Sequence, residues 1–223
     1  MSPADRLALA HYGTALRAAA ADRSTALHLH DPTGTRPPRR LPLARWCGGL
    51  QPGDDALLTR CTGATLDVGC GPGRLAAALA VRGRAVLGID ISAHAVALAR
   101  GRGAPARRAD VFAIPDRPDW RHVLLADGNI GIGGDPANLL RRCARLLVPG
   151  GDVLVEVDPP GAGSWHGPVT LHLGDRPSRP FPWAAVAADD LAALADRAAL
   201  TLLETWTEAH RWFARLTPGQ PAG

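Results

Sequence analysis

One glycine-rich segment constrains the fold more than any other part of the sequence. Residues 66–74 read Leu-Asp-Val-Gly-Cys-Gly-Pro-Gly-Arg, so an apolar run reaches Asp67 and then passes through Gly69, Gly71 and Gly73. An Ala- and Leu-rich stretch follows the last glycine. Glycine is favoured where the backbone takes positive φ angles or lets a ligand approach closely. A strand, a glycine-rich turn and a helix N-terminus in this order are typical of a cradle for a nucleotide-like cofactor.

The bulk composition limits the class of protein. With 223 residues, 46% of them hydrophobic, the chain is long enough for one α/β domain with a short extension. All 25 basic residues are arginine and they are scattered along the chain. The net charge of +4 therefore indicates a solvated surface, because a nucleic-acid footprint would be a concentrated basic stripe.

The cysteines and the apolar segments indicate neither a metal site nor a membrane. None of the four cysteines forms a Cys-x-x-Cys pair or lies at a zinc spacing from histidine, which favours free thiols in a reducing compartment. No segment approaches the ~20 apolar residues of a membrane span, and the first residues lack a signal-peptide pattern. We therefore expect a cytoplasmic protein without a metal or a membrane partner, as a monomer or homodimer.

From residue 64 onward, predicted strands and helices alternate. The strands are expected at 65–68, 85–89, 106–109, 121–126 and 152–157, with two closing strands at 201–207 and 210–216. The helices are expected at 75–82, 136–147 and 188–198, and Ser92 is expected to cap a further helix that runs to about residue 100. This alternation predicts a Rossmann-like, doubly wound α/β fold with a mainly parallel seven-stranded sheet and a C-terminal antiparallel hairpin.

The remaining segments are less regular. Residues 3–21 predict an Ala-rich helix, 25–46 a Pro- and Arg-rich hairpin or irregular lid, and 158–187 an irregular Pro- and Gly-rich stretch. We therefore divide one compact domain into two parts. Residues 1–60 are an N-terminal helix with a lid or acceptor-side extension, and residues 61–217 are the core.

Four motifs occur in a fixed order along this core. Residues 67–73 give an acidic residue followed by Gly-x-Gly-x-Gly, Asp90 ends the second strand and Asp110 follows the third. A Leu-rich helix then leads into Pro-Gly-Gly at 149–151 and the fifth strand. Together these motifs resemble the class I S-adenosylmethionine-dependent methyltransferases over about residues 60–216. The resemblance implies S-adenosylmethionine as the cofactor.

The resemblance also implies roles for individual residues. Asp90 lies 17 residues after Gly73, near the ~20 expected of a carboxylate that binds ribose hydroxyls. Asp110 is expected to hold the adenine amino group, with the backbone of Val111 at the ring edge. The structural alternatives are a turn residue for Asp67, a helix cap for Asp90 and an ordinary loop aspartate for Asp110. The predicted cofactor-binding set is Asp67, Gly69, Cys70, Gly71, Gly73, Asp90, Ile91, Asp110, Val111, Asp127 and Gly128.

Two features favour a sulfonium cofactor over NAD, although an NAD-dependent oxidoreductase stays open as an alternative. The glycines follow Gly-x-Gly-x-Gly rather than Gly-x-Gly-x-x-Gly, because residue 74 is arginine. Asp67 before the loop suits a ligand with an ammonium and a sulfonium group and would repel a pyrophosphate.

The loop after the fourth strand is where the resemblance places the methyl group and the acceptor. It has four glycines in the seven positions 128–134, and Asp127 and Asn129 are candidates to touch cofactor or acceptor. A flexible turn is the alternative. The loop lacks the Asn-Pro-Pro-Tyr and Pro-Cys patterns of enzymes that methylate DNA bases, glutamine or cytosine carbon.

Candidate catalytic residues lie outside the core motifs. Methyl transfer from an activated sulfonium needs mainly proximity and orientation, and a general base assists a hydroxyl acceptor. The candidates are Tyr12 on the N-terminal helix, His166 in the irregular insert and Asp127. For a single histidine, a surface or core role is the more common explanation. Further acceptor-side candidates are Trp46, Trp165, Phe181 and Trp183 as pocket walls, Arg45 as a lid pin or anion contact, and Glu156 and Asp158.

The sequence therefore predicts a methyltransferase that acts on a small molecule. The short variable segments at the N-terminus and after the fifth strand suit a small acceptor better than a folded macromolecule. A methyltransferase for RNA or protein and a non-catalytic cofactor-binding or regulatory protein are the alternatives, and a nucleic-acid partner is not expected.

Overall fold

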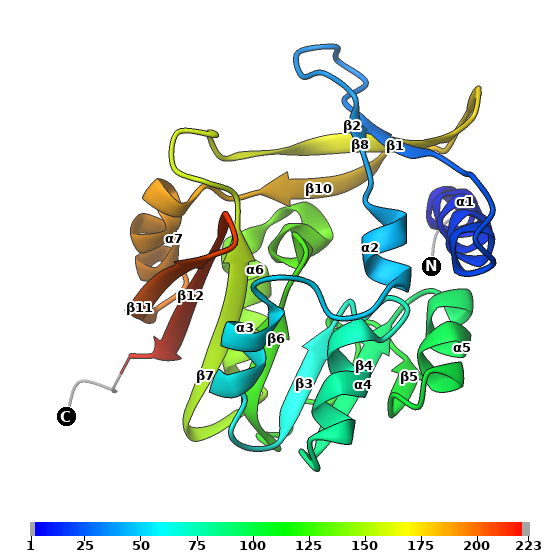
Figure 1. The fold of residues 1–223 in the computed structure, drawn as a ribbon. Helices are drawn as coiled ribbons and strands as arrows, with labels where there is room; N and C mark the ends of the chain where they lie inside the picture. Colours follow the sequence, from blue (N-terminus) through cyan, green and yellow to red (C-terminus); the bar gives the residue numbers. More distant parts are fainter. Residues whose placement is uncertain (1–2, 220–223) are drawn as a thin grey trace.

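The main body of the protein is a seven-stranded mixed sheet (Figure 1). The structure, a computed structural model, describes residues 3–219, with side chains described from residue 7 onward. The strand order is β11-β12-β7-β6-β3-β4-β5. Strands β3 to β7 run parallel, and β12 runs antiparallel to both β7 and β11, which confirms the predicted fold class. The bounds are β3 (Thr65–Val68), β4 (Val86–Asp90), β5 (Ala106–Arg108), β6 (Trp120–Leu125), β7 (Leu147–Val157), β11 (Leu200–Glu208) and β12 (Arg211–Pro218).

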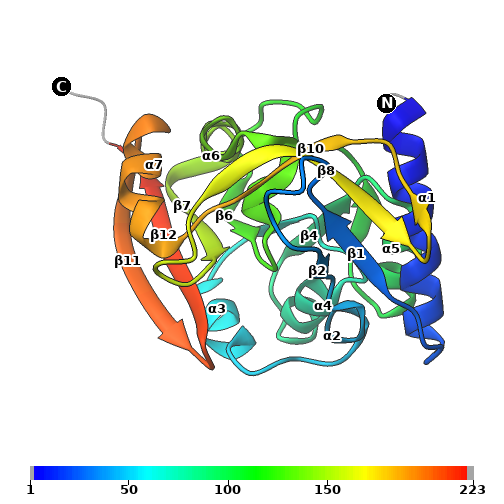
Figure 2. The same ribbon diagram turned by 90° about the horizontal axis from the view of Figure 1, so that it is seen from above.

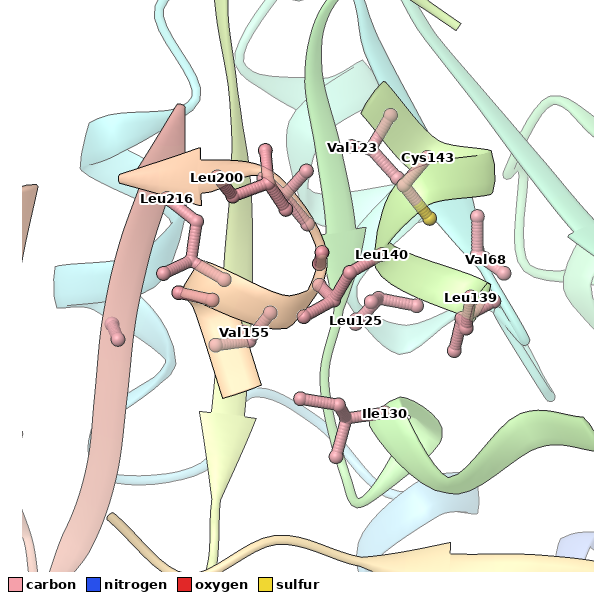
Figure 3. Close-up of a cluster of buried hydrophobic side chains, with 14 of the residues drawn as sticks. Val68, Val123, Leu125, Ile130, Leu139, Leu140, Cys143, Val155, Leu200 and Leu216 are labelled. Carbon is pink, nitrogen blue, oxygen red and sulfur yellow. The ribbon is translucent and has the colours of Figure 1, made fainter. Parts of the chain in front are cut away.

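Helices cover both faces of this sheet because its strands are apolar on both sides. In β6, Val123 and Leu125 pack in one buried cluster and Leu124 packs in another, as alternation along a strand requires. Figure 3 shows the first cluster, in which Leu140 and Cys143 lie among residues of the sheet. The sheet face that bears Val123 and Leu125 is covered by α6 (Pro136–Ala144) and by α7 (Leu191–Arg197), which follows the 3₁₀ turn η2 (Ala188–Asp190). The opposite face is covered by α3 (Asp54–Arg60), α4 (Arg74–Val81) and α5 (Ala93–Gly101).

The transition from α6 to β7 differs from the prediction. Helix α6 ends at Ala144 rather than near residue 147, and β7 begins at Leu147 rather than at residue 152. The Pro-Gly-Gly sequence lies inside β7, where Gly150 has a φ of 75° and the pairing with β6 shifts register. A positive φ at glycine introduces an irregularity without ending the strand.

A second, five-stranded antiparallel sheet lies across one end of the first (Figures 1 and 2). We call it the lid sheet. Its order is β10-β8-β1-β2, with β9 paired to β8. The expectation of an irregular stretch over 158–187 was therefore wrong for most of its length. The bounds are β1 (Leu27–His30), β2 (Arg39–Arg40), β8 (Trp165–Leu173), β9 (Arg176–Pro177) and β10 (Phe181–Ala185).

The lid sheet could not be predicted from local sequence patterns because its strands come from distant segments of the chain. His28 pairs with His172, and Leu29 pairs with Leu171. The prolines and glycines of β8 and β10 indicate turns locally, but the cross-strand partners supply the pairing. The predicted division at residue 60 stays a prediction, since this sheet draws strands from both sides of it.

Two helices attach the lid sheet to the main body. Helix α1 (Pro3–Ala20) agrees with the predicted helix, whereas α2 (Leu43–Cys47) and α3 were not predicted. Leu16 of α1, Leu27 of β1 and Leu43 of α2 are nearly inaccessible to solvent and belong to one apolar cluster with Leu171. This cluster fixes α1 and α2 beneath the lid sheet.

We predict that Gly131→Ala destabilises the protein by about 1–3 kcal/mol, because a Cβ there would overlap the backbone oxygen of Ala184 in β10. Gly131 lies in the 3₁₀ segment η1 (Asn129–Gly134), against which β10 packs. Urea unfolding measures the change. Gly101→Ala is the control, since a Cβ at that position meets nothing within 4 Å. Equal midpoints for the two variants would show that the lid sheet does not pack tightly on η1.

Candidate functional site

The glycine loop joins β3 to α4 at the carboxyl edge of the main sheet. Gly69, Gly71 and Gly73 have φ angles of 71°, 53° and 79°, which favour glycine. A Cβ on Gly73 would come within 2.7 Å of the Ala99 side chain in α5, so this glycine also allows close helix packing. The Asn129 amide donates to the carbonyl of Gly69 at 2.9 Å. The loop is therefore held from both sides.

Two buried carboxylates face this loop without a cationic partner among the described residues. Asp67 is 2% exposed and Asp90 is 7% exposed, and neither forms an ion pair within residues 3–219. Burial, with a smaller contribution from Asp127 and Asp90, raises the pKa of Asp67 to about 7. Burial likewise raises the pKa of Asp90 to about 6, against two backbone hydrogen bonds that lower it. Buried charges are normally paired, so these two carboxylates lack a positive partner within the described chain.

Asp90 is oriented by the loops on both sides of it. The backbone N–H of Gly71 donates to Oδ2 at 3.0 Å, and the N–H of Ser92 donates to Oδ1 at 2.7 Å. Ser92 itself caps α5 by accepting from the N–H of Ala95. Each carboxylate oxygen keeps a free lone pair. Asp90 thus holds the glycine loop and can still accept a bond from a ligand.

The remaining predicted cofactor residues are placed around the same edge. Asp110 is exposed and accepts the N–H of Phe112 at 2.9 Å, as a loop aspartate does. Val111 is buried, and Ile91 is 45% exposed. Cys70 is buried, and burial raises the pKa of its thiol far above the ordinary value, so the thiol is protonated at neutral pH.

Tyr12 reaches into this site from α1. Its hydroxyl lies 3.3 Å from the position that a Cβ on Gly71 would occupy, and its ring meets that of Trp46 edge-on with centroids 6.3 Å apart. Burial, followed by the charge of Asp90, holds the pKa of Tyr12 well above its ordinary value. The phenol is therefore protonated at neutral pH and is able to donate a hydrogen bond.

A closed ring of alternating charges lies beside the glycine loop. Three arginines and three carboxylates, each from a different element or loop, form it, and we call it the charge ring. In order around the ring they are Asp54, Arg74, Asp127, Arg45, Glu156 and Arg211.

The contacts around the charge ring are short. Arg74 binds Asp54 and also Asp127, the latter at 2.5 Å. Arg211 donates through Nε and Nη2 to both oxygens of Glu156 at 2.8 and 2.9 Å and through Nη1 to Asp54 at 2.7 Å. Bidentate pairs of this kind fix both side chains.

Arg45 closes the charge ring from the lid side. Its Nη2 lies 3.0 Å from Asp127 Oδ1 and 3.4 Å from Glu156 Oε1. Because α2 carries Arg45 and packs beneath the lid sheet, the charge ring links α2 to the ends of β6 and β7. The expectation that Arg45 pins the lid agrees with these contacts.

The charge ring surrounds two acceptor-side carboxylates, Glu156 and Asp127, with arginine side chains. Burial pushes the pKa of Glu156 up, but hydrogen bonds and charge from Arg211 outweigh it, so the pKa lies below the ordinary value. Glu156 also accepts the N–H of Asp127 at 2.7 Å. Asp127 has a φ of 54°, which is strained for a residue with a side chain. Arginine side chains contact both carboxylates.

His166 does not join the glycine loop. It lies exposed on β8, on the wall of an open hollow of about 320 Å³ that also includes Pro168, Phe181 and Pro182. None of the glycine-loop residues lines this hollow. Phe181 and Trp183 of β10 meet edge-on with centroids 6.3 Å apart, and their role as walls of an acceptor pocket stays a prediction.

Sequence reasoning missed three members of the charge ring. Arg74 directly follows Gly73, so its proximity to the loop was readable from the sequence. Asp54 and Arg211 are separated by 157 residues and carried no signal.

Two further structural features bear on the class of protein. Among residues 3–219, no helix has the length and apolarity needed to cross a membrane. In the same part of the chain, no group of three or more His, Cys, Asp or Glu side chains is placed to hold a metal ion.

The part of the chain that contains the glycine loop is similar to known methyltransferases. Residues 65–151 match the family model described as a methyltransferase domain. Over 93 residues the chain is 36% identical to a ubiquinone biosynthesis O-methyltransferase of Nitrosomonas europaea, which covers 39% of this chain and 40% of that protein. A 34% match over 95 residues to the same enzyme of Pseudomonas fluorescens covers 40% and 41%. The chain thus spans about two fifths of the length of these relatives.

Solved structures of methyltransferases share the fold of this chain over most or nearly all of its length. A methyltransferase from Bacteroides fragilis, crystallised with S-adenosyl-L-homocysteine, superposes with a TM-score of 0.79 at 23% identity and covers 98% of both chains. The CcbJ methyltransferase from Streptomyces caelestis gives a TM-score of 0.57 at 18% identity over 74% of this chain and 88% of that one. The first comparison includes the lid sheet, because nearly all of this chain is covered.

We predict that Asp67→Asn stabilises the unliganded protein at pH 8 and much less near pH 4. A pKa raised from 3.8 to about 7 favours the fold while the group is protonated, and this contribution is lost as the pH rises through 7. One pKa unit is about 1.4 kcal/mol, and 1 kcal/mol shifts Tm by about 2–4 °C at this chain length. Thermal unfolding is expected to show a gain of at least about 3 °C at pH 8.

The matched control for this prediction is Asp119→Asn, because Asp119 is exposed. The Tm of this variant is expected to equal that of the wild-type protein. A lower Tm for Asp67→Asn at pH 8 would mean that the ionised carboxylate stabilises the empty fold, contrary to the argument from burial.

Proposed function

We propose that this protein transfers a methyl group from S-adenosylmethionine to a small-molecule acceptor. Residues 65–151 match a methyltransferase-domain family model, and the whole chain shares the fold of a methyltransferase crystallised with S-adenosyl-L-homocysteine. The single observation that carries the proposal is the pair of buried carboxylates, Asp67 and Asp90, without a cationic partner among the described residues. A ligand with an ammonium and a sulfonium group would supply a positive partner for these two carboxylates.

The donor set fits this cofactor. Asp90 would accept from the ribose, Asp67 would face the cationic end, and the positive-φ glycines would allow close approach to the backbone. Two buried donors at the lid side, Nε of Arg45 and Nε1 of Trp46, have no hydrogen-bond partner in the described structure, and they suit the carboxylate of the methionyl group. When bound, S-adenosylmethionine supplies an electrophilic methyl group.

The lid sheet supports a small acceptor. It lies over the carboxyl edge of the main sheet and brings β10, with Phe181 and Trp183, against η1. An acceptor approaching that edge would meet an apolar wall and the charged ends of β6 and β7. The curated relatives named above are O-methyltransferases of ubiquinone biosynthesis, so a hydroxyl on an apolar ring is the first acceptor class to test.

The side chains at this edge favour orientation over general-base catalysis. Tyr12 is a protonated donor, and Asp127 and Glu156 are engaged by arginine. Of the predicted catalytic candidates, Tyr12 and Asp127 lie next to the glycine loop and His166 lines a separate hollow. Alignment of the two reactants alone contributes as much as ~7–11 kcal/mol in well-oriented systems.

The test combines binding with turnover. Calorimetry with S-adenosylmethionine, S-adenosylhomocysteine and NADH is expected to show binding of the first two only. Release of S-adenosylhomocysteine is then measured over a panel of small hydroxyl and amine acceptors, with RNA and protein as rival arms. Absence of binding to both sulfur compounds would refute the proposal, and turnover with RNA or protein alone would refute the small-molecule acceptor.

We predict that Asp90→Ala weakens binding of S-adenosylhomocysteine at least tenfold. One lost charge-assisted hydrogen bond is worth about 1.5–3 kcal/mol, and the variant also frees the N–H of Gly71. Calorimetry at pH 7.5 measures the change, with exposed Asp119→Ala as the control. Unchanged affinity would exclude Asp90 from the ribose site.

We also predict that affinity for S-adenosylmethionine falls as the pH is lowered below 7. The cationic donor binds the ionised carboxylates, and Asp67 and Asp90 take up protons near pH 7 and 6. The loss approaches about tenfold per pH unit once one group is protonated before binding. S-Adenosylhomocysteine, which lacks the sulfonium charge, is expected to lose less. Equal affinities for the donor at pH 8 and 5.5 would contradict this coupling.

A further inference from the structure

The charge ring is electrically balanced, and its balance depends on a residue far from the sequence motifs. Three arginines face three carboxylates, so the formal charge of the ring is zero. Asp54 is fully buried and contributes one carboxylate from the first turn of α3. It binds Arg74 and Arg211 and accepts the N–H of Gln51 at 2.7 Å. No solvent reaches this carboxylate to screen it.

The charge ring touches the glycine loop at two points. Arg74 is bonded covalently to Gly73, the last glycine of the loop. Asp127 lies two residues before Asn129, whose amide donates to the carbonyls of Val68 and Gly69 at 3.0 and 2.9 Å. A change of charge in the ring therefore acts directly on the proposed donor site, through a region of low dielectric.

We propose that Asp54 is a positioning residue which keeps the charge ring neutral and thereby sets the preference of the site for the sulfonium donor over its thioether product. This inference rests on the proposed function. The donor and the product differ by one positive charge at sulfur, whereas their adenosine and amino-acid groups are the same. Any net charge on the ring therefore changes the binding of the two molecules unequally.

Neutralising Asp54 leaves three arginines against two carboxylates. The ring then carries one positive charge beside the site, which repels the sulfonium more than the thioether. Asparagine keeps one of the two acceptor oxygens of Asp54, so one of Arg74 and Arg211 also loses its contact at this position. A purely structural role for Asp54 would weaken both ligands alike, so the ratio of the two affinities separates the two explanations.

The experiment compares Asp54→Asn with Asp55→Asn by calorimetry. Asp55 is the next residue on α3; its side chain is 71% exposed and pairs with Arg82, so it matches the change in net charge without entering the ring. For Asp54→Asn, affinity for S-adenosylmethionine is expected to fall at least about threefold relative to S-adenosylhomocysteine. Asp55→Asn is expected to keep the wild-type ratio, and Asp54→Glu to restore it in part. An unchanged ratio in Asp54→Asn overturns the proposal.

A second variant decides the matter if Asp54→Asn does not fold. Arg45→Gln removes a positive charge from the half-exposed side of the charge ring, where the side chain is 29% accessible. The ratio is expected to move the other way, in favour of S-adenosylmethionine, and a ratio equal to that of the wild type overturns the proposal. If the wild-type protein binds neither compound, the proposed function itself fails, which is distinct from binding with an unaltered ratio.

Discussion

Burial of carboxylates at the carboxyl edge of the main sheet is the constraint on which the rest of the structure depends. Five acidic side chains gather there, and the protein treats them in two ways. Asp54, Asp127 and Glu156 are matched by arginines in the charge ring. Asp67 and Asp90 are left without a cation in the described chain. A fold does not keep buried charge unpaired without another reason, and ligand binding is the reason proposed here.

The charge ring explains how the lid sheet and α2, which come from distant segments of the chain, keep a fixed position relative to the main sheet. Its members come from α2, α3, α4, β7, β12 and the loop after β6, so six parts of the chain share one set of contacts. Arg45 is the member that α2 supplies to this set. The apolar cluster around Leu16, Leu27 and Leu43 stabilises the packing of these elements through burial of apolar surface. The directional ion pairs of the charge ring fix their orientation.

The core could be predicted from the sequence because its signals are local. The strand-loop-helix pattern around Gly71, the carboxylate at the end of β4 and the Ser92 cap each depend on neighbours in the chain. The lid sheet and the charge ring could not be predicted, since their partners are far apart in sequence. Asp54 pairs with a residue of β12, and β1 pairs with β8. The roles of individual site residues stay predictions until ligand is bound.

The pairing of β1 with β8 has a consequence for how the chain is made. His30 and Thr170 are cross-strand partners although 140 positions separate them, so the amino-terminal strands leave the ribosome long before their partner exists. Contacts of such large sequence separation form slowly, after the local units have condensed. During synthesis, the apolar side chains of β1 therefore lack their β8 partners until the last third of the chain appears.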